Sequence, residues 1–256
     1  MNTQRVIGVD VGGSGVKAAL VDVAKGDLAS DRQRLDTPQP ATPTQVAGTV
    51  AQLVDGLGGA PTVGVTVPAV VRDGVVRTAA NIDRRWIGTD AARLFGEALG
   101  VPCAVLNDAD AAGLAEMRFG AGVGRTGVVI VVTLGTGIGS ALFHGGELLP
   151  NTELGHLEMR GMVGEHYAAA AVRKAEGLSW ERWGRRVGRY LAVLNALFSP
   201  ELIIVGGGVS RRFERFAEAI HAKVPDTEVV PAQLRNQAGI VGAAAAATRT
   251  QRSGAE

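Results

Sequence analysis

The feature that most constrains the fold of this chain is a strand–turn–strand pattern that occurs twice. The first copy, VIGVDVGGSGVKAAL, places an apolar run that ends in Asp10 before a glycine-rich turn and a second apolar run from Val16 to Val23. A shift of 123 residues aligns it with VIVVTLGTGIGSAL, which begins at Val129. Because internal repeats mark repeated structural units, the sequence predicts two related α/β lobes, each containing one such hairpin.

Both turns have the composition of a phosphate-binding loop. Glycines have no side chain and can adopt positive φ, so that main-chain N–H groups can come close to an anion. Asp10, at the end of the first apolar run, supplies a hard oxygen for Mg²⁺. Two such turns can clamp different phosphates of one donor, although each hairpin taken alone is also typical of a plain tight turn. The candidate donor-binding residues are Gly12, Gly13, Ser14, Gly15 and Lys17 in the first hairpin and Thr133, Gly135, Thr136 and Gly137 in the second.

Composition narrows the class of protein. The chain has 256 residues, of which 36 are glycines. Hydrophobic residues make up 46% of the chain and aromatic residues only 4%, a composition that is typical of an α/β enzyme. The 26 basic and 25 acidic residues nearly balance, so no nucleic-acid partner is expected. A single cysteine, Cys103, excludes an internal disulfide framework and favours a cytoplasmic location. We expect neither a signal peptide nor a membrane span, because the apolar segment 128–143 is short and interrupted.

Residue patterns predict further elements between and after the hairpins. Apolar runs predict strands at 63–67, 104–106 and 202–205. Helices are predicted at 44–57 with Thr44 as the cap, at 90–99, at 172–198 with bends near Gly177 and Gly184, and at 239–248, followed by a frayed tail. The long helix carries an apolar stripe from Trp180 to Phe198, which indicates core or subunit contact. Its arginines, Arg182, Arg185, Arg186 and Arg189, indicate a solvated face.

Asn107 and Asp108 lie where the strand 104–106 gives way to an alanine-rich helix. The exposed N–H groups at a helix N-terminus keep a carboxylate ionised, and an ionised Asp108 can accept a proton from a substrate hydroxyl. The competing interpretation is a helix N-cap, which spacing alone favours.

Polar residues also gather in ELLPNTELGHLEMRG, where Glu153, His156 and Glu158 fall within six positions. Metal binding, hydrogen bonding to a polyol and an ordinary surface loop are all compatible with this composition. Because this segment has neither an HExxH spacing nor nearby cysteines, hydrogen bonding to a polyol is favoured over metal binding. The run from Gly206 to Gly208 follows a strand and precedes a helix, which brings backbone close to a flat or anionic ligand.

Seven blocks of sequence make the chain resemble the ROK family of sugar kinases, and within it the polyphosphate-using glucokinase branch of actinobacteria. They are DVGGSGVK (10–17), TPQPATP (37–43), RTAANIDRRWIGTD (77–90), LNDADAAGLAE (106–116), TLGTGIGS (133–140), PNTELGHLE (150–158) and NQAGIVGAA (236–244). The resemblance implies an actin-like ATPase (ribonuclease H-like) α/β fold. Its N-terminal lobe would be 1–107 with the last helix, 239–250, its C-terminal lobe 108–238, and its active site the cleft between them.

The resemblance also implies roles for single residues. Asp108 matches the general base that takes the proton from the sugar 6-hydroxyl. Asp10 matches the residue near Mg²⁺, directly or through water. No zinc is expected, because the cysteine-rich motif of many ROK kinases is absent. The implied sugar-binding residues are Asn81, Asn107, Glu153, His156 and Glu165, and the implied donor-side glycines are Gly206, Gly207 and Gly208.

The implied function is that of a cytoplasmic, homodimeric hexokinase that makes glucose 6-phosphate from glucose with inorganic polyphosphate and ATP. The alternatives are an ATP-only enzyme, a kinase of mannose or glucosamine, and a non-catalytic sugar sensor. The sensor is disfavoured, because its helix-turn-helix would not fit in the five residues before the first strand. Val163 and Tyr167 depart from the branch, which carries a glutamate and a basic residue there. Candidate polyphosphate contacts are Lys17, Arg84, Arg85 and the arginines between 182 and 189.

Overall fold

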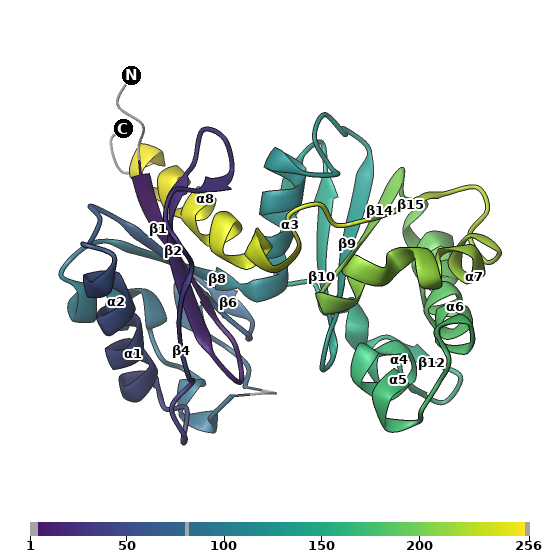
Figure 1. Cartoon of the computed structure of the whole chain (residues 1–256), viewed down its shortest axis with the longest axis horizontal. Helices are drawn as coiled ribbons and strands as arrows, with labels where there is room; N and C mark the ends of the chain where they lie inside the picture. The colour runs from purple at the N-terminus through teal and green to yellow at the C-terminus, as the bar shows by residue number, and fades with distance from the viewer. Residues whose placement is uncertain (1–4, 80–81, 254–256) are drawn as a thin grey trace. The chain divides into compact units, whose positions relative to one another are not determined.

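A computed structural model describes residues 5–79 and 82–253 of the chain (Figure 1). These residues form two compact units. The first unit contains the chain up to Ala115 and again from Gln237 onward, and the second contains Glu116–Asn236. The division falls within helix α3 (Asp108–Phe119), whereas the resemblance placed the boundary immediately before Asp108.

The first unit is built on a mixed sheet with the strand order β3-β2-β1-β5-β8, and β4 also pairs with β2. Strand β1 is antiparallel to β2 and parallel to β5, which is parallel to β8. The strands are β1 (Arg5–Val11), β2 (Val16–Asp22), β3 (Asp27–Leu28), β4 (Gln33–Leu35), β5 (Val63–Val67) and β8 (Cys103–Asn107), with a separate ribbon of β6 (Val71–Arg72) and β7 (Val75–Val76). The helices are α1 (Pro43–Gly56), α2 (Ala91–Leu99) and α8 (Ala238–Ser253), with a 3₁₀ turn at Arg84–Trp86.

Alternation along the strands decides which helix covers which face of this sheet. Ile7 and Val9 of β1 belong to the core that includes Val50 of α1 and Phe95 of α2. The residue between them, Gly8, points the other way, toward α8, which packs against β1, β5 and β8. The sheet therefore lies between α1 and α2 on one side and α8 on the other (Figure 1).

The second unit repeats this strand order. Its sheet runs β11-β10-β9-β14-β15, with β9 antiparallel to β10 and parallel to β14. The predicted hairpin repeat thus corresponds to the same topology in each unit. The strands are β9 (Val128–Leu134), β10 (Ile138–His144), β11 (Glu147–Leu149), β14 (Leu202–Gly206) and β15 (Glu228–Pro231), with a ribbon of β12 (Glu158–Met159) and β13 (Met162–Val163). The helices are α4 (Gly164–Ala168), α5 (Ala170–Ala175), α6 (Trp180–Phe198) and α7 (Ala217–His221), with 3₁₀ turns at Leu154–His156, Gly208–Arg215 and Arg235–Gln237.

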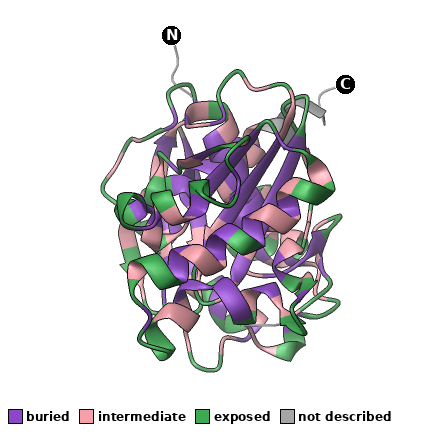
Figure 2. Cartoon of the chain, turned by 90° about the vertical axis from the view of Figure 1, so that its right-hand side faces the viewer, coloured by how far each residue is buried: buried purple, intermediate pink, exposed green. Residues whose placement is uncertain are grey.

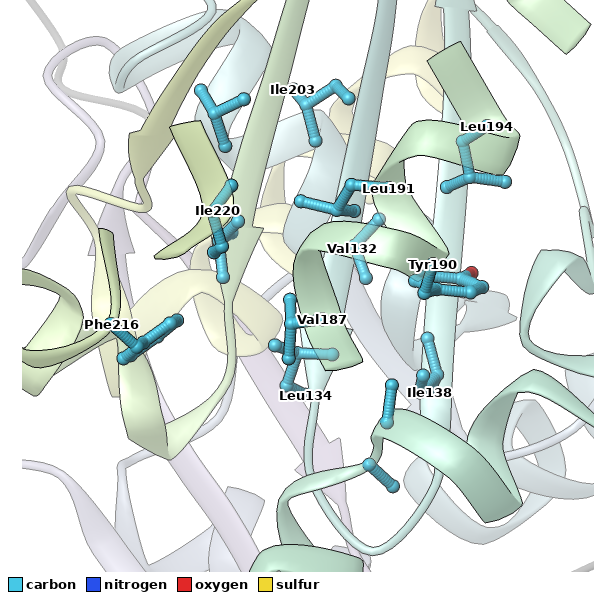
Figure 3. Close-up of a cluster of buried hydrophobic side chains, with 14 of the residues drawn as sticks. Val132, Leu134, Ile138, Val187, Tyr190, Leu191, Leu194, Ile203, Phe216 and Ile220 are labelled. Carbon is cyan, nitrogen blue, oxygen red and sulfur yellow. The ribbon is translucent and has the colours of Figure 1, made fainter. Parts of the chain in front are cut away.

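Helix α6 supplies the core of the second unit through its apolar stripe (Figure 3). Val187, Tyr190, Leu191 and Leu194 are fully buried against side chains of the sheet. The strands beneath the helices are buried along most of their length (Figure 2). Leu197 alone turns outward and is 59% exposed, whereas Phe198 is half-buried against the same core. Most of the predicted stripe is therefore core, as its spacing indicated.

Three predicted details of the helices are wrong. Thr42, not Thr44, caps α1, since its hydroxyl accepts the Gln45 N–H at 3.3 Å. The helical segment is interrupted at Gly177, which has φ of +60°, as expected, but α6 continues through Gly184. A Cβ on Gly184 would lie 2.8 Å from the Phe216 Cβ, so a glycine is needed there for close packing. The expected tail after 248 is helical as far as Ser253.

Glycines allow α8 to approach its neighbours at backbone distance. A Cβ placed on Gly64 of β5 would lie 1.9 Å from the Ala243 carbonyl oxygen, and one on Gly8 1.9 Å from that of Ile240. A Cβ on Gly242 of α8 itself would lie 1.8 Å from the Ala111 oxygen. Side chains are excluded at all three positions. Among the described residues, no helix is long and apolar enough to cross a bilayer.

Cys103 at the start of β8 is expected to react slowly with thiol reagents in the folded protein. Burial raises the pKa of its thiol to about 12, so almost no thiolate is present at neutral pH. Titration with Ellman's reagent in buffer and in denaturant measures the difference, and the single cysteine makes the signal unambiguous. Rapid stoichiometric labelling of the native protein would contradict this expectation.

Candidate active site

The first glycine-rich turn is closed by backbone contacts and anchored from β4 and the segment after it. Gly12 donates its N–H to the Gly15 oxygen at 3.1 Å, and the Thr37 hydroxyl donates to the Gly12 oxygen at 2.5 Å. Contrary to our expectation, neither Gly12, Gly13 nor Gly15 has a positive φ. The space beside the turn is open at Gly13, where a Cβ would meet no atom within 4 Å, whereas a Cβ on Gly15 would lie 2.6 Å from the Arg34 side chain. The turn can therefore present backbone to a ligand.

Asp10 lies at the end of β1, beside this turn, with both carboxylate oxygens engaged. Lys17 Nζ is 3.3 Å from Oδ2, and the Thr66 hydroxyl donates to Oδ1 at 3.1 Å. The lysine and the aspartate face each other because Asp10 and Lys17 are register partners in the β1–β2 hairpin. Asp10 is thus held in place, next to one positive charge.

A cavity of about 230 Å³ adjoins the first turn. Three of the sequence blocks that carry the family resemblance converge on it. Trp86 is buried there, and its indole N–H donates to the Ala41 oxygen at 2.9 Å. The cavity is lined by Val11, Gly12, Gly13, Thr37, Gln39, Pro40, Ala41, Val46, Val67, Pro68, Ile82, Asp83 and Trp86. Asn81, a predicted sugar-binding residue, lies outside the described residues.

The helix-cap role that the sequence left open for Asp108 belongs instead to Asn107, which the resemblance had assigned to sugar binding. Asn107 is buried, and its side-chain oxygen accepts the N–H groups of Ala109 at 2.8 Å and Asp110 at 3.1 Å, while its amide donates to the Ala69 oxygen. Asn107 is therefore the cap of α3. Asp108 is exposed in the first turn, where its Oδ1 accepts the Ala109 N–H at 2.9 Å. Its carboxylate lies at the positive end of the α3 dipole, where a negative charge is stabilised, and the asparagine before it holds the first turn of the helix.

In the second unit, Glu165 contacts the second glycine-rich turn. Gly135 donates to the Gly137 oxygen at 3.0 Å, and Ile138 N–H lies 3.4 Å from Glu165 Oε2. A Cβ on Gly137 would collide with that same carboxylate oxygen. The absence of a side chain at Gly137 thus lets the carboxylate reach the turn.

Glu165 also completes a cluster with Glu153 and His156. His156 Nδ1 lies 3.5 Å from Glu153 Oε2, and Nε2 lies 3.7 Å from Glu165 Oε1. The strand β10 fixes this loop, since Ser140 Oγ donates to the Thr152 oxygen at 2.7 Å and accepts the Leu154 N–H. Partial desolvation raises the pKa of Glu153, with His156 opposing and Glu165 adding to the shift. Two carboxylates and an imidazole suit hydrogen bonding to sugar hydroxyls.

The metal interpretation of this loop gains no support from the geometry. Within residues 5–79 and 82–253, no group of three or more His, Cys, Asp or Glu side chains is arranged to hold a metal ion. Glu158 is in β12 and pairs with Val163 of β13, apart from the Glu153–His156–Glu165 cluster. The departure at Tyr167 is structural: its ring is buried and its hydroxyl accepts from Arg189 at 3.0 Å.

The glycines after β14 lie against the second hairpin. Gly207 has φ of +81°, and a Cβ there would lie 2.4 Å from the Leu134 oxygen. Gly206 is the register partner of Thr133. Gly208 lines a cavity of about 550 Å³ together with Gly135 and Thr136. Its other walls include Arg173, Lys174, Trp180 and Arg212; of these the sequence pointed only to Trp180, as part of the apolar stripe of the long helix.

Comparisons with known proteins agree with the family resemblance of the sequence. The model of the ROK family matches residues 6–169 and 168–250. The polyphosphate glucokinase of Mycobacterium tuberculosis (strain CDC 1551 / Oshkosh) is 50% identical over 240 residues, which cover 93% of this chain and 89% of that protein. The crystal structure of the inorganic polyphosphate/ATP-glucomannokinase from Arthrobacter sp. strain KM has a TM-score of 0.90 at 49% identity, covering 96% of this chain and 99% of the other.

A more distant structure shows the same fold with ligands. The ROK family glucokinase from Streptomyces griseus, in complex with glucose and AMPPNP, has a TM-score of 0.83 at 29% identity and covers 96% of this chain and 99% of the other.

Proposed function

This chain belongs to the ROK family, and from that premise we propose that it is a hexokinase that transfers a phosphoryl group from inorganic polyphosphate to the 6-hydroxyl of glucose. ATP is the second donor. The relatives that support this are a polyphosphate glucokinase at 50% identity and a polyphosphate/ATP-glucomannokinase at 49%. The observation that carries the catalytic assignment is an exposed Asp108 at the start of α3, next to an asparagine that already caps the helix.

In this proposal Asp108 is the general base. It accepts the proton of the 6-hydroxyl as that oxygen forms a bond to the terminal phosphorus of the donor. The bond between that phosphorus and its bridging oxygen breaks, and the donor leaves one phosphate shorter. Asn107 positions Asp108 by fixing the first turn of α3. Glu153, His156 and Glu165 bind hydroxyls of the hexose, and we assign Asn81 to the same role from the family resemblance.

In this proposal the two glycine-rich turns and the glycines at the end of β14 bind the phosphates of the donor. The first turn, Gly12, Gly13, Ser14 and Gly15, is open at Gly13, and Lys17 follows it in β2. In the second unit, Gly135, Thr136, Gly137 and Gly208 contribute, with Thr133, Gly206 and Gly207 supporting their conformation. Main-chain N–H groups and a lysine stabilise the charge that develops on the transferred group.

Magnesium is the proposed cofactor, and Asp10 is the residue that would hold it. Both carboxylate oxygens of Asp10 already have partners, Lys17 and Thr66. A lone carboxylate of this kind fits an ion that keeps most of its water and is bound chiefly by substrate phosphates. Asp10 would therefore contact Mg²⁺ through water. The ion supplies charge neutralisation of the donor phosphates when bound.

The decisive experiment is glucose 6-phosphate formation by the purified protein with long-chain polyphosphate or ATP at matched terminal-phosphate concentration. A substantial rate with polyphosphate is the expected result. Activity with ATP alone would show the donor assignment to be wrong, and activity only with mannose or glucosamine would replace the acceptor. Binding of glucose without turnover with any donor would favour the sensor.

We expect the KM for glucose to rise on acidification at a higher pH than for a site with an ordinary glutamate. The raised pKa of Glu153 means that its carboxylate is protonated earlier as the pH falls, and the neutral acid is a weaker acceptor for sugar hydroxyls. Glu153→Gln should raise KM about 10-fold at neutral pH and flatten this acid limb. The measurement is KM against pH, with Glu158→Gln as the neighbouring control. An unchanged profile in Glu153→Gln would remove Glu153 from the sugar site.

We also propose a homodimer in the cytoplasm. The single cysteine, with its unreactive thiol, suits a reducing compartment. Leu149 and Leu197 are more than half exposed, and an apolar groove beside Leu149 is lined by Phe143, Leu148 and Phe198. Such exposed apolar surface is typical of subunit contacts, and light scattering on the purified protein measures the mass.

A further inference from the structure

The chain passes between the two units twice. It crosses first inside α3, between Ala115 and Glu116, and it crosses back between Asn236 and Gln237, just before α8. We propose that Glu116 holds these two connections together and, by fixing the C-terminal part of α3, positions Asp108 at the start of the same helix. This inference rests on the proposed function, because Glu116 acts through the general base assigned there.

The carboxylate of Glu116 accepts three main-chain N–H groups. Its Oε1 accepts the Leu234 N–H at 2.7 Å, and its Oε2 accepts the Gln233 N–H at 3.1 Å and the Ala121 N–H at 3.0 Å. Gln233 and Leu234 lie just before the second connection, and Ala121 follows the end of α3. One side chain therefore binds together the segments at both connections, although these are 117 and 118 residues apart in the sequence.

The surroundings of Glu116 require a carboxylate. The residue is 1% exposed, and a polar group is buried at little cost only where it is hydrogen-bonded. All three partners are donors, so two acceptor oxygens match them, whereas a glutamine offers one oxygen and one NH₂ group. A Cβ on Gly120 would collide with Oε2, so the absence of a side chain there lets the carboxylate reach its partners. The contact is therefore specific to a glutamate at this position.

Helix α3 connects this contact to the proposed general base. The helix is continuous from Asp108 through Glu116, and at 1.5 Å per residue the two lie about 12 Å apart along it. Asn107 fixes the first turn, and α8 packs on the helix at Ala111. The hydrogen bonds of Glu116 add a third fixed point, so the direction of the helix axis is determined as well as its start.

A change in the direction of α3 displaces Asp108. Over about 12 Å, a tilt of about 5° moves one end of the helix by about 1 Å relative to the other. A displacement of about 1 Å at a reacting group can lower the rate about 100-fold, and the two remaining contacts of the helix resist part of this movement. Loss of the Glu116 contact should therefore lower kcat and leave sugar binding by the Glu153–His156–Glu165 cluster intact, since that cluster lies on other elements.

Glu116→Gln, made alone and together with Asp108→Asn, tests this positioning role. Glutamine keeps the size of the side chain but turns an NH₂ group toward at least one main-chain N–H. The matched control is Glu201→Gln, which also removes a carboxylate that accepts a main-chain N–H in the second unit, that of Gly127 at 2.8 Å. The measurements are kcat and KM for glucose at saturating donor, with kcat referred to the folded fraction measured by circular dichroism.

We expect Glu116→Gln to lower kcat about 10-fold with the KM for glucose within about 3-fold, and Glu201→Gln to match the wild type. In the Asp108→Asn background, Glu116→Gln should lower kcat by less than about 2-fold, because the carboxylate that it positions is already absent. Equal losses in the two backgrounds are the result of a merely structural role and would overturn the proposal. An unchanged kcat in Glu116→Gln, or an equal loss in Glu201→Gln, would overturn it too.

Gly120→Ala reaches the same contact without changing Glu116, and it serves as the test if the glutamine variant does not fold. Its Cβ would push the carboxylate away from the Ala121 and Gln233 N–H groups. The same fall in kcat is expected, again only where Asp108 is present, and an unchanged kcat would contradict the role of Glu116. A wild-type protein without kinase activity, or a near-normal kcat in Asp108→Asn alone, would instead overturn the proposed function.

Discussion

Replacing Asp108 by asparagine should lower kcat by about 10²- to 10⁴-fold while leaving the KM for glucose within about 3-fold, as expected for loss of a general base. Asparagine keeps the size of the side chain and a hydrogen-bond acceptor for the Ala109 N–H, so α3 should remain intact. The cap itself is Asn107, which the change does not touch. The readout is glucose 6-phosphate formation at saturating donor and varied glucose.

Asp90→Asn is the matched control for this variant. Asp90 also lies at a helix start, where its carboxylate accepts the Arg93 N–H at 2.9 Å and caps α2. Asparagine caps a helix about as well as aspartate, so both activity and stability should stay close to wild type. A near-normal kcat in Asp108→Asn would contradict the general-base role, and an equal loss in Asp90→Asn would point to a structural cause.

The largest expected effect on stability comes from a single methyl group under α8. Gly64→Ala would place its Cβ 1.9 Å from the Ala243 backbone oxygen, a distance that no rotamer relieves. Either α8 or β5 must shift, and we expect a loss of about 3 kcal/mol or more in the free energy of unfolding. Urea denaturation followed by circular dichroism measures it.

Gly48→Ala separates this clash from the general effect of replacing glycine. Gly48 is exposed within α1, and a Cβ there would meet nothing within 4 Å. Because alanine favours a helix more than glycine does, this variant should be more stable by up to about 1 kcal/mol. If both variants behaved alike, the close packing of α8 on the sheet would not control the stability of the first unit.

The sequence predicted the fold well because its strongest signals are local or repeated. The hairpins at 6–23 and 129–144 are marked by apolar runs on either side of glycines, and each is found where the pattern placed it. The apolar stripe of α6 identified its buried face for the same reason. Boundaries were less accurate: Thr42 and Thr44 are both good caps, and the signal that selects Thr42 is Pro43, which occupies the first position of α1.

The walls of the cavity beside the second glycine-rich turn were only partly predictable from the sequence. Motifs identified the glycine-rich turns, but Arg173, Trp180 and Arg212 come from three separate segments with no common spacing, and only the folded chain brings them together. Conversely, Arg185 and Arg186 appeared available in the sequence, but each finds a glutamate partner within ten residues. Charge in a sequence does not reveal which charges are already neutralised by neighbours.

The discontinuity of the first unit bears on the order in which the protein folds during synthesis. Its central strands β1 and β5 are covered on one side by α8, which emerges from the ribosome only after the whole second unit. The second unit is continuous in sequence and has its own core, so it can fold as soon as it is complete, since domains generally fold as units. Until then the face of the first sheet that contains Gly8 and Gly64 stays uncovered, so we expect the first unit to complete its folding last.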